Sequence, residues 1–375
     1  MKLILHVGMS KTGSTALQNR LANSRKELLK QGVLYPEVSF SADHNFLSLF
    51  LRKGDQAPPN FIKKYQGETD LMMRHAESNW LAIKRQVQKY SPHTIILSGE
   101  SIFIGLTNSS FDLFKARLQE LTSEIQVIVY IRKPSAHYLS SIQEKIKSSG
   151  IFPDPSPKSL RASIEVCESI SHNKPIVVAY EQNQLFLGDI TCDFMQRVLP
   201  AVKLSENSDH FIRENETLSA ESMSILYDFH LEFSTNPTMV NAHHLIRLLR
   251  DIEKKNTFIT RPKLKVDIAD YIDQSSLDLI WLAERYQVIF RDLDYSLIGK
   301  YQERPTVELN QLPNICIIDG AIKTKILMQL LDALIKPKFW IPHNLALWIK
   351  RNTGRSSLRF IRNSSIGNFI YKNFL

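Results

Sequence analysis

The chain has 375 residues, 43% of them hydrophobic and 23% charged, and its formal net charge at pH 7 is +9. This composition is ordinary for a globular protein, and the length allows one large α/β domain or two domains.

Three cysteines (Cys167, Cys192 and Cys316) lie far apart without CxxC or Cys/His spacing, which argues against a zinc site or a disulfide framework. The first apolar run is too short for a signal peptide, and no run reaches the roughly 18 residues of a membrane span. We therefore expect a cytoplasmic protein.

Four apolar, β-branched runs are each followed by a polar residue and a helix-like stretch. The runs are residues 3–7, 93–98, 125–131 and 174–180, and the first leads into a helical pattern over 14–32. Near-continuous apolar strands that alternate with helices are typical of a parallel sheet buried on both faces. The sequence therefore predicts an α/β fold of the P-loop type, with three layers around a central parallel sheet.

From residue 217 onward the pattern becomes mostly helical, and Ser or Thr precedes each periodic run. We expect a helix-rich C-terminal part after the sheet, within an α/β domain that covers residues 1–300. We expect residues 301–313 to form a linker and residues 314–375 to form a basic, aromatic-rich segment. That last segment holds ten Lys and Arg against two Asp, a net charge of +8, so residues 1–313 carry only +1.

The loop after the first strand is rich in glycine and hydroxyl residues. Gly8 and Gly13 have the spacing of the Walker A phosphate loop, and Thr15 fills its closing Ser/Thr place. Ser14 stands where the phosphate-binding lysine is expected, and Lys11 lies three residues earlier. A glycine-rich turn between strand and helix presents backbone N–H groups to an anion. We predict an anion site that uses the hydroxyls of Ser14 and Thr15 and the charge of Lys11; the alternative is an ordinary strand-to-helix turn.

A second candidate anion site follows the strand at 125–131. Arg132 comes directly after that run, where parallel sheets place ligand-binding groups. Pro134 suits the first turn of a helix, and Ser140 and Ser141 come about two turns later. An arginine fork with a hydroxyl can cradle a phosphate dianion. The alternative is a surface ion pair for Arg132 and a solvated helix face for the serines.

The residues that follow the later strands bear on the type of reaction. Hydrolysis of a magnesium nucleotide needs an aspartate after a second strand to hold the metal shell. The runs here end instead in Ser98–Glu100, Arg132–Pro134 and Tyr180–Gln182, and none ends in aspartate. This shifts the prediction from triphosphate chemistry to another phosphorylated donor. Glu100 can serve as a general base at its strand end, although a glutamate there is often a helix cap or an ion-pair partner.

Two motifs together resemble a known family. The first is H-x-G-x-x-K-T-G-[ST]-T-x-L-Q over residues 6–18, and the second is R-x-P-x(5)-S with Arg132, Pro134 and Ser140. They resemble bacterial sulfotransferases related to the heparan and carbohydrate sulfotransferases, which use 3′-phosphoadenosine 5′-phosphosulfate (PAPS). Further segments look like later blocks of that family up to about residue 300, namely 32–38, 43–47, 96–103, 179–195 and 213–221. The glycine-rich lysine loop that many relatives carry near the C-terminus is not evident here.

The resemblance implies a donor site built on the first loop. The backbone N–H groups of Thr12, Gly13, Ser14 and Thr15, with the hydroxyls of the last two, would hold the 5′-phosphate of PAPS. Lys11 would neutralise the charge that builds on this leaving group. The scheme requires no metal.

The resemblance also assigns the 3′-phosphate to Arg132 and Ser140, and the deprotonation of the acceptor to Glu100. His44 is the alternative base, because other sulfotransferases use histidine. The implied reaction is in-line transfer of a sulfuryl group to a hydroxyl or amine, and we expect a carbohydrate or glycolipid acceptor.

A P-loop kinase or NTPase, or a non-catalytic nucleotide-binding partner in glycan assembly, stays open as an alternative. The basic tail lacks a recognisable nucleic-acid-binding module.

Residues 336–375 interleave cations with seven aromatic residues. The aromatics are Phe339, Trp340, Trp348, Phe360, Phe369, Tyr371 and Phe374. Short amphipathic pieces of this composition suit the surface of an anionic bilayer, where each cation contributes about 1 kcal/mol. Three roles are open: peripheral binding at the inner face of the membrane, packing of the aromatics on the catalytic domain, and docking of a polyanionic acceptor.

Overall fold

The computed structural model describes residues 1–39, 41–51, 56–106, 111–152, 155, 159–205, 217–233, 242–300, 304–305 and 308–335. The chain divides into two compact units that interleave in sequence. The first comprises Met1–His137, Pro157–Ile212 and Asp273–Tyr301, and the second comprises Tyr138–Ser156, Arg213–Ile272 and Gln302–Leu375. The domain boundaries expected from the sequence at residues 300 and 313 stay a prediction.

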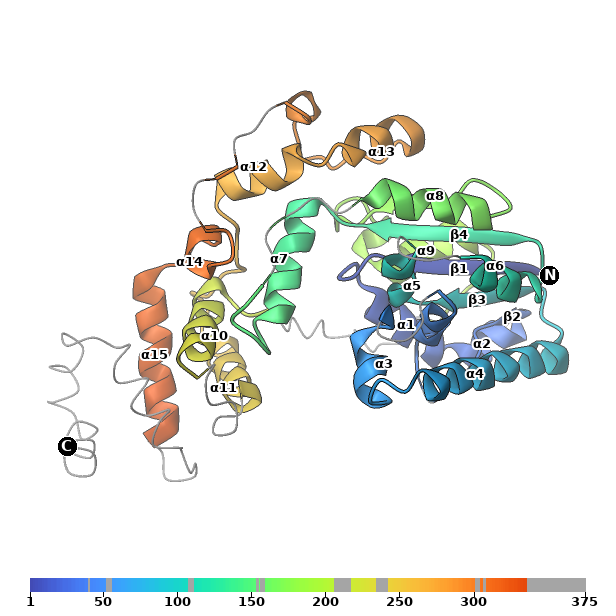
Figure 1. Ribbon diagram of the computed structural model, residues 1–375, viewed down its shortest axis with the longest axis horizontal. Coiled ribbons are helices and arrows are strands. Elements are labelled where there is room, and N and C mark those ends of the chain that lie inside the picture. Colours follow the sequence, from blue (N-terminus) through green and yellow to red (C-terminus); the bar gives the residue numbers. More distant parts are fainter. Residues whose placement is uncertain are drawn as a thin grey trace, which may run out of the picture. The chain divides into compact units, whose positions relative to one another are not determined.

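The first unit is built on a five-stranded parallel sheet (Figure 1). Its strands are β1 (Lys2–Gly8), β2 (Val33–Leu34), β3 (Thr94–Ser98), β4 (Ile125–Ile131) and β5 (Ile176–Ala179). They run in the order β2-β3-β1-β4-β5, and every neighbouring pair is parallel. Four strands match the predicted apolar runs, whereas β2 was not predicted because two residues carry no periodicity. The α/β fold class is confirmed.

Helices connect the strands of this unit and also follow its last strand, β5. They are α1 (Ser14–Asn23), α2 (Arg25–Lys30), α3 (Pro59–Lys64), α4 (Thr69–Tyr90), α5 (Glu100–Gly105), α6 (Asp112–Gln119), α8 (Leu160–Ile170), α9 (Ile190–Val198) and α13 (Asp278–Tyr286), with the 3₁₀ helices η1 (Asn45–Phe50), η3 (Phe186–Gly188) and η4 (Tyr295–Leu297). Helices α7 (Pro134–Lys145) and α12 (Val266–Gln274) contain residues of both units. The single helix predicted over 14–32 is wrong, because Ser24 separates α1 from α2. Asn and Ser are poor helix formers, since their side chains compete for backbone hydrogen bonds.

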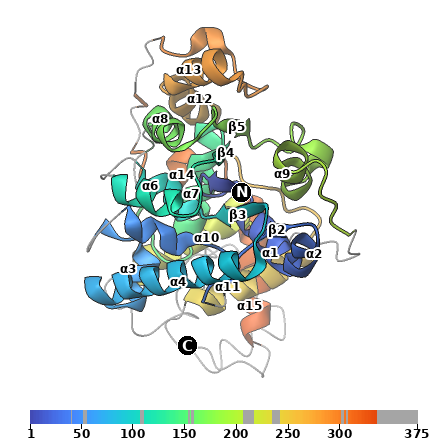
Figure 2. The same ribbon diagram turned by 90° about the vertical axis from the view of Figure 1, so that its right-hand side faces the viewer.

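Both faces of the sheet are covered, which gives the first unit its three layers. Leu3 and Leu5 of β1 pack with residues of η1, α4, α6 and α8, whereas Ile4 packs with residues of α1, α2 and α9. Figure 2 shows α6 and α8 on one side of the sheet and α1, α2 and α9 on the other. Successive side chains of a strand point to opposite faces, so a doubly covered sheet needs the near-continuous apolar runs that the sequence shows.

The second unit is helical. Its helices, labelled in Figure 1, are α10 (Ala220–Phe233), α11 (Ala242–Lys254), α14 (Leu312–Ile315) and α15 (Gly320–Ile335). They pack around a separate apolar core that includes Leu226, Leu249 and Leu330. The predicted helix-rich C-terminal part is thus confirmed. In the described part of the chain, no helix combines the length and the apolar character needed to cross a membrane. The cationic tail over 336–375 lies outside the described residues.

Candidate functional site

The loop between β1 and α1 turns sharply at two residues. Lys11 (φ 67°) and Gly13 (φ 76°) both have left-handed backbone conformations. Glycine adopts this conformation freely, whereas the side chain of a residue such as Lys11 makes it cost about 1–2 kcal/mol. A Cβ atom on Gly13 would lie 2.8 Å from Oη of Tyr180, so this position also has no room for a side chain. Backbone strain of this kind clusters at functional sites.

The loop ends at the N-terminus of α1. Gly13 precedes the first helical residue and supplies no capping side chain. The first N–H groups of a helix have no partner within the helix, and the helix dipole adds partial positive charge at this end. The N-terminus of α1 therefore offers an anion both hydrogen-bond donors and a favourable field.

The three hydroxyls of the loop are placed differently from one another. Thr15 is exposed, whereas Thr12 is buried and donates to the carbonyl of Met9 at 2.6 Å. Ser14 is only 2% exposed, and a Cβ atom on Gly8 would collide with its Oγ. The hydroxyl of Ser14 thus lies beneath the loop, where no partner for it is found among the described residues. The sequence could not show this inward orientation.

The two predicted anion motifs meet at neighbouring strands. Nη1 of Arg132, which follows β4, donates to the carbonyl oxygen of Lys11 at 3.1 Å. A second hydrogen bond joins Oγ of Ser10 and Nε2 of His137, the latter on α7, at 2.9 Å. Strands β1 and β4 are adjacent and parallel. Lys11, which follows β1, and Arg132, which follows β4, therefore lie at the same carboxyl edge of the sheet, where α/β proteins bind ligands.

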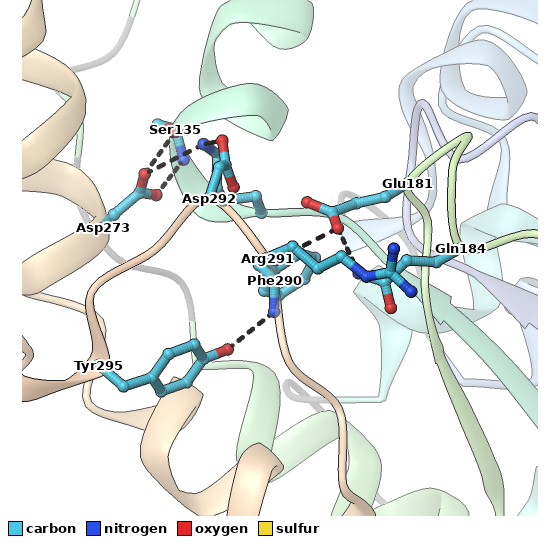
Figure 3. Close-up of polar contacts among 9 residues, drawn as sticks. Ser135, Glu181, Gln184, Asp273, Phe290, Arg291, Asp292 and Tyr295 are labelled. Atoms are coloured by element: carbon cyan, nitrogen blue, oxygen red, sulfur yellow. Dashed lines mark hydrogen bonds and ion pairs between the residues drawn. The ribbon is translucent and has the colours of Figure 1, made fainter.

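The start of α7 already holds a carboxylate. Oδ1 of Asp273 accepts from the backbone N–H of Ser135 (2.8 Å), and Oδ2 accepts from the hydroxyl of the same serine (2.7 Å), as Figure 3 shows. Lys133 is ion-paired with Asp292 and lies 3.9 Å from Asp273. Burial raises the pKa of Asp273, although the bonds from Ser135 and the charge of Lys133 oppose this. The adjacent residues Arg132 and Lys133 therefore have different partners: Arg132 is bonded to the loop after β1, whereas Lys133 is paired with carboxylates.

Sequence reasoning missed this cap, because Asp273 lies 138 residues from Ser135 and has no local signature. Ser140 is also on α7, but it belongs to the second unit whereas Arg132 belongs to the first. A shared phosphate site for Arg132 and Ser140 therefore stays a prediction.

Glu100 is the first residue of α5 and is half-buried. The residues on either side of it are anchored: the N–H of Gly99 donates to the carbonyl of His6 (3.1 Å), and the N–H of Ser101 donates to Oδ1 of Asn45 (3.0 Å). Glu100 follows β3, the neighbour of β1 on the side opposite β4. Three adjacent strands thus end next to Glu100, Lys11 and Arg132 in that order.

His44 is fully buried, and both of its ring nitrogens are engaged by the backbone. Nδ1 accepts from the N–H of Ser98 (3.1 Å), and Nε2 lies 3.1 Å from the carbonyl of Pro36. A backbone N–H only donates and a carbonyl only accepts, so the proton is on Nε2. Burial lowers the pKa of His44 to about 4. In this arrangement the ring has no lone pair left for a substrate proton.

A buried polar cluster behind the loop was not given a role from the sequence. Nδ1 of His6 lies 2.7 Å from Oγ of Ser98, which also accepts from Nε2 of Gln18 at 3.1 Å. These residues come from β1, β3 and α1, and all are buried. Burial lowers the pKa of His6 to about 3, so the ring is neutral. The sequence offered two signals: a histidine inside an apolar strand, and the place of His6 and Gln18 at the two ends of the motif over residues 6–18.

Comparisons with known proteins add little to this geometry. No family model matches the chain, and no curated protein matches it. A solved structure, the sulfotransferase domain from the curacin biosynthetic pathway, is 11% identical, with a TM-score of 0.30 over 55% of this chain and 75% of that chain. A likeness this weak carries no argument about activity. Among the described residues, no group of three or more His, Cys, Asp or Glu is arranged to hold a metal ion.

Proposed function

We propose that this protein is a sulfotransferase that moves a sulfuryl group from PAPS to a hydroxyl or amine of an acceptor. The observation that supports this most is the order of charged groups along the sheet edge. A carboxylate (Glu100), a loop lysine (Lys11) and an arginine (Arg132) follow three adjacent strands, and the arginine is bonded to the loop itself. This order suits an acceptor, a transferring group and a nucleotide phosphate bound side by side.

The donor would bind with its 5′-phosphosulfate at the N-terminus of α1. The N–H groups from Thr12 to Thr15 would donate to the 5′-phosphate there, and Lys11 would supply a full charge. Arg132 would bind the 3′-phosphate and so distinguish PAPS from ATP; the part expected of Ser140 in this contact stays a prediction. We assign the phosphate to Arg132 because it follows β4 directly and its Nη1 is bonded to the loop that carries Lys11; its neighbour Lys133 is ion-paired with Asp292.

The reaction would be an in-line displacement at sulfur. The acceptor oxygen or nitrogen forms a bond to sulfur, and the bond between sulfur and the bridging oxygen of the phosphosulfate breaks. The electron pair of that bond stays on the 5′-phosphate, whose growing charge Lys11 partly neutralises. The acceptor proton passes to the carboxylate of Glu100. As in phosphoryl transfer, the protein contributes positioning and charge stabilisation rather than covalent chemistry.

Glu100 is a better candidate base than His44. Its side chain is half-buried at the sheet edge, whereas both nitrogens of His44 are committed to Ser98 and Pro36. We assign His44 a supporting role: it holds the end of β3, two residues before Glu100. A carbohydrate or glycolipid acceptor completes the proposal, on the resemblance of the motifs alone.

Calorimetry with purified protein tests the donor assignment. We expect 3′-phosphoadenosine 5′-phosphate (PAP) to bind without magnesium and more tightly than ATP. Tighter binding of ATP that depends on magnesium would overturn the proposal in favour of a kinase or NTPase. Binding of PAP without any transfer of sulfate from labelled PAPS to a panel of glycans and glycolipids would favour the non-catalytic alternative.

A further inference from the structure

His6 lies between the donor loop and the strand that leads to Glu100. Its carbonyl accepts from the N–H of Gly99 (3.1 Å), and its Nδ1 is bonded to Oγ of Ser98 (2.7 Å). The ring is fully buried and stands edge-on to Tyr130 and Phe194. The main chain and the side chain of His6 are therefore both attached to the end of β3.

The other ring nitrogen of His6 is turned away from Ser98. Cε1 of His6 lies 3.3 Å from the place where a Cβ atom on Gly8 would be, and Oγ of Ser14 crowds the same place. Nε2 of His6 and Oγ of Ser14 are both buried, and neither has a hydrogen-bond partner in the described part of the chain. Buried polar atoms without partners are rare in native proteins and call for an explanation.

Either tautomer of His6 leaves one unused group at this place. If the Ser98 hydroxyl donates to Nδ1, Nε2 carries a hydrogen; if Nδ1 donates, Nε2 has a free lone pair. Nε2 of His6 and Oγ of Ser14 are not bonded to each other in this structure. One bridging water, or a small movement of the loop, would let the Ser14 hydroxyl accept from an Nε2–H group or donate to an Nε2 lone pair. One nitrogen of the ring is thus bonded to β3, and the other is the unpaired buried nitrogen on the side of the ring that lies near Gly8 and Ser14.

We propose that His6 is a positioning residue that couples the donor loop to the turn carrying Glu100, through Ser14 on one side and Ser98 on the other. This inference rests on the proposed function, since it treats the loop as the donor site and Glu100 as the base. Through this coupling, binding of PAPS at the donor loop (residues 9–13, between β1 and α1) would align Glu100 with the sulfuryl group.

Ser98 is suited to transmit this coupling because each of its polar atoms has a partner. Its Oγ bonds to His6 and Gln18, its N–H to Nδ1 of His44, and its carbonyl to the N–H of His44 (2.7 Å). Two residues later the chain reaches Glu100, so a shift of Ser98 moves the base. The network is fully buried, and water therefore does not replace a lost partner easily.

Hydrogen exchange measured by mass spectrometry tests the link in the full chain. His6→Phe keeps an aromatic ring beside Tyr130 and Phe194 but removes both nitrogens, and Ser98→Ala removes the other end of the bond. We expect each variant to raise exchange about 10-fold in peptides covering residues 98–105. His6→Asn retains a polar group near the position of Nδ1 and should restore most of the protection. Exposed His172→Gln is the control and should change nothing.

The coupling itself is read with PAP as the probe. In the wild type, saturating PAP should slow exchange over 98–105; in His6→Phe it should bind but fail to do so. If His6→Phe raised exchange in α8 as much as in residues 98–105, the effect would be general loosening, and the inference would be overturned. Protection of residues 98–105 by PAP that survives in His6→Phe would overturn it too. If PAP does not bind the wild type, the donor assignment fails, and the experiment without nucleotide still decides whether His6 holds the Glu100 turn.

Discussion

At the scale of single residues, Arg132 can be tested for its part in donor selectivity, that is, the preference for a nucleotide with a 3′-phosphate. Its Nη1 is bonded to the carbonyl of Lys11, which places it beside the loop proposed to bind the donor. Arg132→Ala removes a charge-assisted contact worth roughly 1.5–3 kcal/mol, so PAP should bind on the order of 10–150-fold more weakly. ADP lacks the 3′-phosphate, and its affinity should change far less. Lys133→Ala is the matched control, because this neighbouring cation is ion-paired with Asp292. Equal losses for PAP and ADP in calorimetry would refute the assignment of the 3′-phosphate.

The proposed catalytic pair separates by kinetics. Lys11→Ala should lower turnover by roughly 10²–10³-fold, as loss of a charge partner of the transition state does. Glu100→Gln should keep the affinity for PAP and lose turnover, since the amide has the shape of the carboxylate but not its basicity. The readout is the transfer of labelled sulfate from PAPS to a responsive acceptor. Activity that survives in Glu100→Gln but is abolished in His44→Ala would make His44 the base.

The buried histidines predict how stability depends on pH. Burial lowers the pKa of His6 to about 3 and that of His44 to about 4, against about 6.5 in the unfolded chain. Below pH 6.5 the unfolded state therefore takes up protons that the folded state does not, and the free energy of unfolding falls until the folded pKa is reached. At pH 5 each histidine should cost about 2 kcal/mol.

Urea unfolding at pH 7 and at pH 5 measures this loss. His6→Phe should reduce the difference between the two pH values by about 2 kcal/mol, which is the share of one histidine. His172→Gln, at an exposed position, should leave the difference unchanged. A wild-type stability that is the same at both pH values would contradict the burial of these two rings.

At the scale of elements, the N-terminus of α7 depends on a side chain from α12. Asp273→Ala should lower the free energy of unfolding by about 0.5–2 kcal/mol, the usual cost of a lost helix cap. Asp292→Ala is the control, because its carboxylate is 62% exposed and an exposed ion pair contributes about 0–1 kcal/mol. Denaturant unfolding compares the two. A larger loss in Asp292→Ala would mean that the ion pair, not the cap, holds this region.

Single elements were predictable where a local pattern is strong. The apolar runs of β1 and β4 placed two strands correctly, and the glycine-bearing turn before Ser14 placed the start of α1. Helix α2 was merged with α1, since the apolar periodicity continues across Ser24.

At the scale of the whole molecule, the charge is concentrated in the segment 314–375, whose last forty residues lie outside the described part. We propose that residues 336–375 hold the protein at an anionic bilayer. The full chain should then sediment with anionic but not neutral liposomes, and raised salt should release it. The chain truncated after Ile335, the last residue of α15, should lose this binding and keep its affinity for PAP. A truncated protein that is insoluble or fails to bind PAP would show instead that the tail packs on the folded part.

The amino-acid sequence was sufficient for features set by neighbours along the chain. Apolar runs dictate buried strands, and the glycine spacing with Lys11 dictates a tight, cationic loop, because periodicity and backbone freedom act over a few residues. Packing alone decided the partners of the polar side chains. Arg132 meets a carbonyl 121 residues away, Asp273 caps a helix 138 residues away, and both nitrogens of His44 are taken by the backbone. Such pairings depend on which strands become neighbours and on what burial leaves within hydrogen-bonding distance, and no local pattern encodes either.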